Sequence, residues 1–383
     1  MHKFVTVNLF LVLFPLYIAA QDTAKVKLSG QIAAWTTMQL RSPIVVQPGV
    51  RFVPELTAKF STTEMRSIDV AASVNVNGHV TFEQRNETWH SIQLKPYRVW
   101  ARYSTPNFEI RAGLQKINFG QAKLFRPLMW FDAMDVRDPF QLTDGVYGLL
   151  TKYFFSNNAS IWTWALLGND KQRGWDLFAC SKWKPEFGGR IEMPVLEGEM
   201  AFTTHYRKVN AFHIESTQSL NYTRLNEHKI GFDGKWDIGM GVWFENSSTI
   251  TETNNYNIPK LQHMFNIGLD YTFAIGNGIG ATVEYLRYHA GETFFRHDNT
   301  LHLVGSIINY PLSITSQLSA ILFYLPTQQN LFSYASWNIS NNNWSFYLIG
   351  YWNPMNAQIP VIQTSSKNLF AGKGMQFMAS YNF

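Results

Sequence analysis

The residues of this chain that could do chemistry are three bases and a stretch rich in acids that lies between two of them. Arg98, Arg111 and Lys152 fall on the polar sides of segments in which apolar and polar residues alternate. Between Arg111 and Lys152, residues 120–145 break this alternation and contain four aspartates. A loop of this length within a compact domain is usually functional. The chemistry indicated is that of opposed fixed charges, which act on ions and polar solutes through their field.

Inside an aqueous pore, residues 120–145 would form a constriction. The acids of the loop would face the bases of the wall and create a transverse field across the narrowest part. The apolar residues between 124 and 130 would anchor the loop, because they are costly to leave bare on an exposed tip. The alternative is that these charges only solvate the interior. The residues predicted for the constriction loop are Asp132, Asp135, Asp138, Arg126 and Arg137, and those for the basic pore wall are Arg98, Arg111 and Lys152.

The pairing of the two strands that carry the first two bases depends on the turn between them. A two-residue turn at Thr105-Pro106 predicts Arg102 opposite Glu109, a cross-strand ion pair with a structural role. In that register, Arg98 and Arg111 have no acidic partner. They are then available to solutes in the pore.

Other functional classes find little support in the residues. The histidines have no spacing typical of a metal site or of a nucleophile and its base, so we predict no catalytic residue, no metal and no cofactor. The single cysteine, Cys180, excludes an internal disulfide framework and is interpreted as a small apolar filler. A net charge of +5 without a long basic run argues against nucleic acid as a partner.

The N-terminus has the pattern of a cleaved export signal. A short basic start, Met1-His2-Lys3, precedes an apolar run that ends in Ala19-Ala20. This run is too short for a lasting membrane span and leads into a small-residue cleavage site. We therefore predict a signal peptide over residues 1–20 and one domain over residues 21–383.

The remaining chain is predicted to be all-β. No later stretch reaches the apolar length of a transmembrane helix, and a closed barrel is the other structure that satisfies every backbone group in lipid. Tight turns alternate with longer loops along the chain, as they do in outer-membrane barrels. This pattern predicts a closed transmembrane antiparallel barrel of about 16 to 18 strands, with one long loop that folds inward. The tight turns are expected near residues 63, 105, 157, 197, 238, 276, 311 and 342.

Residues 374–383 form a strand with a terminal aromatic. Phe377, Tyr381 and Phe383 share its apolar face. The segment resembles the closing strand of Gram-negative outer-membrane β-barrels. In that family it is the signal that the barrel-assembly machinery reads, so the resemblance implies an assembly role for these three residues and a location in the outer membrane.

The constriction arrangement resembles that of general porins. Arg111-x-Gly113-x-Gln115 followed by Phe119-Gly120 is also similar to a segment of anion-selective and alginate-export-type porins. The resemblance implies a passive or weakly selective channel for small hydrophilic solutes, anions among them. The implied partners are outer-membrane lipid and lipopolysaccharide, the barrel-assembly machinery during biogenesis, the solutes themselves, and further copies of the chain in a homo-oligomer. The alternative is a barrel that acts as a scaffold or secretion or assembly component for a protein partner.

Overall fold

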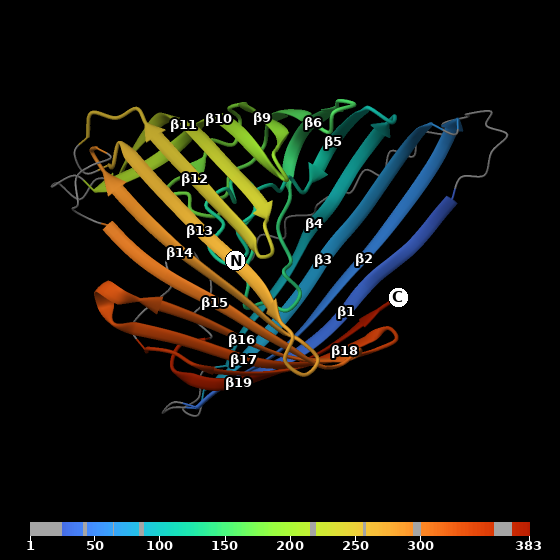
Figure 1. Ribbon diagram of the computed structural model, residues 1–383, viewed down its shortest axis with the longest axis vertical. Helices are drawn as coiled ribbons and strands as arrows, with labels where there is room; N and C mark the ends of the chain where they lie inside the picture. The colour runs from blue at the N-terminus through green and yellow to red at the C-terminus, as the bar shows by residue number, and fades with distance from the viewer. Residues whose placement is uncertain are drawn as a thin grey trace, which may run out of the picture.

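The strands of this protein form one antiparallel sheet that closes on itself (Figure 1). The computed structural model describes residues 25–40, 44–63, 65–83, 88–214, 220–255, 258–293, 300–355 and 370–383. Closure occurs at β1 (Lys25–Gln39), which pairs with both β2 (Val45–Thr63) and β19 (Lys373–Asn382). Nineteen strands are present in these residues, and all except the two-residue β8 (Ala179–Cys180) belong to the ring, which leaves eighteen.

The other strands follow one another around the ring in chain order. They are β3 (Arg66–Glu83), β4 (Thr88–Ser104), β5 (Phe108–Gln115), β6 (Val146–Phe154), β7 (Ser160–Leu166), β9 (Glu186–Val195), β10 (Gly198–Ile214), β11 (Leu220–Asp237), β12 (Gly241–Thr251), β13 (Leu261–Phe273), β14 (Ile279–Gly291), β15 (Thr300–Ser313), β16 (Ser316–Leu325), β17 (Asn330–Asn341) and β18 (Trp344–Trp352), with a short 3-10 helix, η1 (Pro326–Gln328), between β16 and β17.

The faces of the barrel have the polarity that a bilayer demands. On β2 the apolar side chains of Val50, Phe52 and Leu56 point outward and are exposed, and the same holds around the ring. Buried charged and polar residues, such as Glu245 and Glu284, point inward. Because an outer apolar belt and a polar lumen are the reverse of a soluble core, this is a transmembrane barrel. The described residues contain no helix long and apolar enough to cross a bilayer.

The predicted fold class is confirmed. Two of the predicted turns, both next to prolines, lie at slightly different positions from those expected. The turn expected near residue 311 lies instead after Ser313, since Pro311 pairs with Gln317 within the ladder and the register shifts only beyond it. Proline cannot donate to a ladder, and a local irregularity accommodates it. The predicted bulge at Pro96 is confirmed, because Val74 pairs with Pro96 and Ser73 with Arg98. The predicted signal peptide, residues 1–20, lies outside the described residues.

The second deviation concerns the turn between β4 and β5. The main-chain N–H of Thr105 donates to the carbonyl of Phe108 at 2.8 Å, and the N–H of Phe108 donates to Thr105 Oγ1 at 3.1 Å. The turn residues are therefore Pro106-Asn107, with proline at the position its fixed φ favours. Moving the turn by one residue shifts the register by two, so Arg102 lies opposite Arg111. The predicted register is therefore wrong, but the predicted Arg102–Glu109 ion pair is present as a diagonal contact of 3.5 Å, and Arg102 also pairs with Asp69 on β3 at 2.8 Å.

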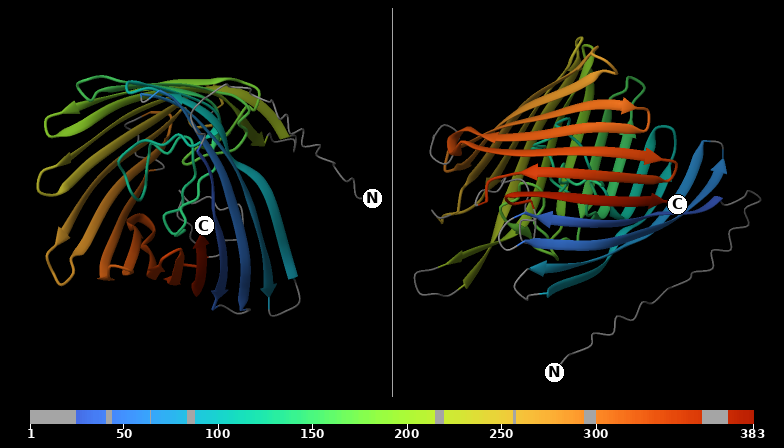
Figure 2. Two further views of the ribbon diagram at one scale, coloured as in Figure 1. Left: turned by 90° about the vertical axis from the view of Figure 1, so that its right-hand side faces the viewer. Right: turned by 90° about the horizontal axis from the view of Figure 1, so that it is seen from below.

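Two segments enter the ring, both from the side of the longer connections. The inward loop, residues 116–145 between β5 and β6, runs through the interior, as the two views of Figure 2 show. The second segment, residues 167–185 between β7 and β9, carries β8. This short strand pairs with Val209 and Asn210 of β10, just past Tyr206, where the pairing of β10 with β9 stops. Together these segments fill a large part of the lumen.

Candidate functional site

The inward loop is held across the lumen by two buried glutamates of the far wall. Glu284 on β14 accepts hydrogen bonds from three consecutive main-chain N–H groups, and Glu245 on β12 accepts from two. The donors to Glu284 are Lys123 at 2.5 Å, Leu124 at 3.2 Å and Phe125 at 3.0 Å, and the donors to Glu245 are Ala122 at 2.6 Å and Leu128 at 3.2 Å. Five buried main-chain N–H groups find their acceptors in these two side chains, so the glutamates fix the path of the loop.

Apolar side chains of the loop add to this anchoring. Leu124 and Phe125 pack in one cluster with Leu286, Leu303 and Phe323 of the wall. A second cluster forms on the opposite wall, where Phe119, Leu128, Trp130 and Phe131 of the loop pack against Leu150 and Trp164. The apolar anchors predicted between residues 124 and 130 are therefore buried, and the first half of the loop packs against two opposite walls of the barrel.

A cavity of about 610 Å³ remains between the inward loop and the wall of β15 to β18, and we call it the passage. The loop side of the passage presents four bases, Lys116, Lys123, Arg126 and Arg137. The wall side presents amides, hydroxyls and two tyrosines, namely Asn309, Gln317, Ser319, Ser336, Asn338, Tyr334 and Tyr347. No carboxylate is among the described residues that line it. Apolar side chains, among them Ile307, Ile321 and Ile349, complete the lining, so the passage is mixed in polarity and positive on one side.

Two of the loop carboxylates lie beside arginines that line the passage, and a third lies near an arginine of the barrel wall. Asp135 pairs with Arg137 at 2.8 Å, Asp132 lies 3.7 Å from Arg126, and Asp138 lies 4.0 Å from Arg51 on β2. Burial raises the pKa of the Asp132 and Asp138 carboxyls above their ordinary value, in both cases against the pull of nearby arginines. Three of the five residues predicted for the constriction thus line no part of the passage, while Arg126 and Arg137 do.

The acid at the end of the loop is tied to the wall. Asp144 forms ion pairs with Lys95 on β4 and with Lys171 of the second segment. Although burial by itself would raise the pKa of the Asp144 carboxyl, hydrogen bonds from the two lysines outweigh it and hold that pKa below its ordinary value. This carboxylate therefore connects three parts of the interior.

Comparison with known proteins gives a match of fold alone. No protein-family model matches the chain, and no curated protein matches it. Among solved structures, Acinetobacter baumannii OccAB4 aligns with a TM-score of 0.55 at 11% identity over 95% of this chain and 99% of that one. Pseudomonas aeruginosa OccK5 (OpdH) gives 0.54 at 10% identity over 94% and 98%. Escherichia coli Wzi, titled an outer-membrane protein and a carbohydrate-binding β-barrel, gives 0.53 at 12% identity over 92% and 84%.

The chain has the fold of the outer-membrane β-barrels.

In this barrel the three bases predicted for the pore wall do not oppose the loop acids as expected. Arg98 donates to the carbonyl of Thr143 at 2.9 Å and so supports the return of the loop. Arg111 pairs with Glu109 at 2.8 Å, and the Lys152 ammonium lies 3.4 Å from the centre of the Trp162 ring. Contrary to expectation, Arg111 has an acidic partner, because Glu109 lies two residues before it on the same face of β5.

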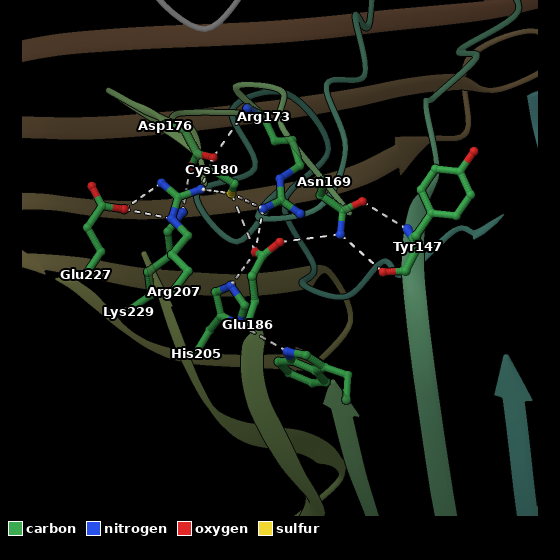
Figure 3. A network of polar contacts seen from close by, with 11 residues as sticks. Tyr147, Asn169, Arg173, Asp176, Cys180, Glu186, His205, Arg207, Glu227 and Lys229 are labelled. Carbon is green, nitrogen blue, oxygen red and sulfur yellow. Dashed lines mark hydrogen bonds and ion pairs between the residues drawn. The ribbon is translucent and has the colours of Figure 1, made fainter. Parts of the chain in front are cut away.

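The second segment of the barrel was missed by sequence reasoning, and it carries a buried charge network (Figure 3). Asp176 pairs with Arg207 and Lys229, and Arg173 pairs with Glu186 at 2.6 Å. Cys180 lies within this network, 2.6 Å from Arg173 Nη2, and is not the apolar filler that was expected. The only sequence signal was the loss of alternation over residues 167–185, which shows that a segment leaves the wall but does not show where it goes.

The three residues predicted for assembly lie on the outer face of the barrel at its seam. The N–H and carbonyl groups of Phe383 form two hydrogen bonds with those of Gly30, each at 3.0 Å. The ring of Phe383 stacks on Phe52 with centroids 6.2 Å apart. Phe377 and Tyr381 pair with Thr36 and Ile32 of β1. Their role in assembly stays a prediction.

Proposed function

We propose that this protein is a passive diffusion channel of the outer membrane with a weak preference for small anions. The observation that carries the proposal is the passage, in which four loop bases face neutral polar groups and no lining carboxylate. A diffusion channel needs a polar lining without tight binding sites, so that solutes enter and leave readily.

The charge of the lining sets the direction of the preference. Positive side chains in a narrow pore with low-dielectric walls raise the local concentration of anions and lower that of cations. At about 4 Å and an effective dielectric constant near 20, one unit charge contributes about 4 kcal/mol before screening by salt. Nearby carboxylates reduce this field, since three of the four lining bases have an acid beside them: Asp270 beside Lys123, Asp132 beside Arg126 and Asp135 beside Arg137. We therefore expect weak anion selectivity.

Reversal potentials in planar bilayers under a salt gradient test this proposal. The double variant Lys116→Gln with Lys123→Gln removes two of the lining bases while keeping the anchoring arginines, and we expect the reversal potential to move toward cation selectivity. The matched control is Lys182→Gln, an exposed lysine of the second segment that pairs with Asp170 and does not line the passage. An unchanged reversal potential in the double variant would contradict the assignment of the passage. A purified barrel that does not conduct would favour the alternative of a scaffold or secretion component.

A further inference from the structure

The wall of the barrel is incomplete beside β4. This strand has 17 residues, but β5, which has 8 residues, pairs with it only over residues 99–104 (Figure 1). In the described part of the chain, residues 88–98 of β4 pair with β3 alone. Leu94 in this unpaired part is 73% exposed, whereas Val99, an outward residue of β4 that pairs with β5, is 49% exposed. The rim of the barrel therefore has a notch between β4 and the shorter strands that follow it.

A cavity of about 390 Å³ lies at this notch, and we call it the rim pocket. Its volume is within the usual range for small-molecule sites. It is lined by Lys95 and Pro96 of the unpaired part of β4, by residues at the ends of β5 and β6, and by residues 168–173 of the second segment. The rim pocket shares no lining residue with the passage, so its occupant need not be a solute in transit.

Residues from both faces of the wall line the rim pocket. Directly paired residues of an antiparallel ladder share a face. Leu114 pairs with Tyr147 and with Val99, and since the latter two are exposed, all three lie on the outer face. Val146 pairs with the fully buried Gln115 and lies on the inner face. Because the ladder between β4 and β5 ends here, no strand separates the two faces, and the pocket is open to the lipid-facing side.

The lining of the rim pocket is amphipathic, and its two kinds of side chain come from different elements. The apolar side chains belong to the wall and the inward loop, namely Pro96, Leu114, Val146, Tyr147, Phe131 and Leu142. The exposed polar ones belong to the second segment, namely Asp170, Lys171 and Gln172. A hydrocarbon chain fits the first set and a polar group fits the second.

The charged side chains of the rim pocket are satisfied within the protein. Each of the six that line it forms an ion pair: Asp144 with Lys95 and Lys171, Asp170 with Lys182, Arg173 with Glu186, and Asp132 with Arg126. A charged ligand would have to compete with these pairs or be buried without a counter-ion, and burying an unpaired charge is costly. The ligand that fits is therefore uncharged.

We infer that the rim pocket binds a single-chain amphiphile with an uncharged polar head, taken from the outer leaflet of the membrane. The chain packs against Pro96, Leu114 and Tyr147, and the head lies beside Gln172 on the water-exposed side. The outer apolar belt continues into the pocket at Leu114 and Tyr147, so the chain enters without leaving an apolar environment. The longer connections of outer-membrane barrels are extracellular, which places this rim at the outer leaflet. The inference goes beyond the proposed channel function, because such binding does not require that the passage conducts.

Photolabelling of the full-length protein in phosphatidylcholine vesicles with 3-azioctanol tests the inference. Light expels N₂ from the diazirine of this alcohol, the resulting carbene inserts into adjacent side chains, and mass spectrometry locates the label. Label should gather at Leu114 and Tyr147. The background is given by Val50 and Phe52, exposed outward residues of β2. Labelling of the β2 residues to the same extent as the pocket residues would overturn the inference.

Competition with unlabelled compounds identifies the head group. Octanol should remove the excess label, whereas octanoate and octylammonium, compared at equal concentrations in the membrane, should be about tenfold less effective, because each brings an unpaired charge into the pocket. Equal competition by the three compounds would show that the head group is not recognised and would overturn the inference. This measurement uses the parent protein and does not depend on the folding of any variant.

Two alanine variants assign the label to the rim pocket. Ala133→Phe fills the pocket from its lining and keeps its six charged residues, so the label at Leu114 and Tyr147 should fall to the background. Ala335→Phe is the matched control, because Ala335 is an exposed alanine of β17 that does not line the pocket, and it should leave the label unchanged. A heat-dependent shift on a denaturing gel shows that each variant is folded. Excess label that survives in folded Ala133→Phe would overturn the inference.

Discussion

At the scale of single residues, the contacts that hold the inward loop are made between charged side chains of the wall and main-chain groups of the loop. Main-chain groups are the same in almost every residue, so the sequence does not mark them. Glu245 and Glu284 lie on predicted strands and could be placed in the lumen from their alternation alone. Their partners are main-chain N–H groups, which every residue of the loop except proline carries, so no residue type marks the contact. The same holds for Arg98, whose acceptor is the carbonyl of Thr143. Charged residues could therefore be found from the sequence, but their roles as loop anchors could not.

The anchoring role of Glu284 leads to a test at this scale. Replacing it with glutamine turns one acceptor oxygen into an N–H₂ group that faces main-chain donors, so at least one of its three hydrogen bonds is lost. We expect a loss of about 1 to 3 kcal/mol in loop anchoring and hence a higher and noisier single-channel conductance in bilayers. The control is Glu292→Gln, which removes a surface ion pair with Lys260 away from the loop. A Glu284→Gln channel as quiet as the parent would show that the apolar clusters alone fix the loop.

At the scale of elements, strands could be predicted well because alternation is local, whereas loops depend on contacts that are distant in sequence. The length of residues 120–145 and their apolar anchors indicated an inward loop, and this is what the structure shows. The path of residues 167–185 is set by Asp176, whose partners Arg207 and Lys229 lie on β10 and β11. The turn at Thr105 differs from its predicted form by one residue, and that single step was enough to place Arg102 directly opposite Arg111, with Glu109 as an acidic neighbour of both.

Asp144, at the end of the inward loop, gives a prediction with a defined pH dependence. Because Lys95 and Lys171 hold the pKa of its carboxyl below the ordinary value of about 4, its stabilising contribution is full above that value and is lost as pH falls below it. Thermal unfolding should therefore show that acidification from pH 6 to pH 3 destabilises the parent more than Asp144→Asn, the variant being less stable at pH 6. Equal acid destabilisation of the two proteins would contradict the assigned ion pairs.

At the scale of the whole molecule, closing the ring joins the two ends of the described chain. The seam between β1 and β19 extends from Gln31 opposite Asn382 to Gln39 opposite Gly374, and Phe383 adds two hydrogen bonds to Gly30 beyond it. The final residue thus contributes a small part of a long ladder. A stability role and an assembly role for Phe383 can therefore be separated, since two hydrogen bonds at about 1 kcal/mol each matter little to a barrel of this size.

Phe383→Ala keeps both main-chain hydrogen bonds and removes only the ring that stacks on Phe52. If the ring is part of the assembly signal, this variant should accumulate less folded protein in the outer membrane of cells, measured by the heat-dependent gel shift, yet refold from urea into detergent as well as the parent. Phe346→Ala is the matched control, because Phe346 is an outward aromatic on β18 with the same exposed fraction of 37%. A parallel loss in cells and in refolding would show that the ring acts through stability. Normal levels of Phe383→Ala in cells would show that β19 is an ordinary closing strand, because a signal read by the assembly machinery must change assembly when its terminal aromatic is removed.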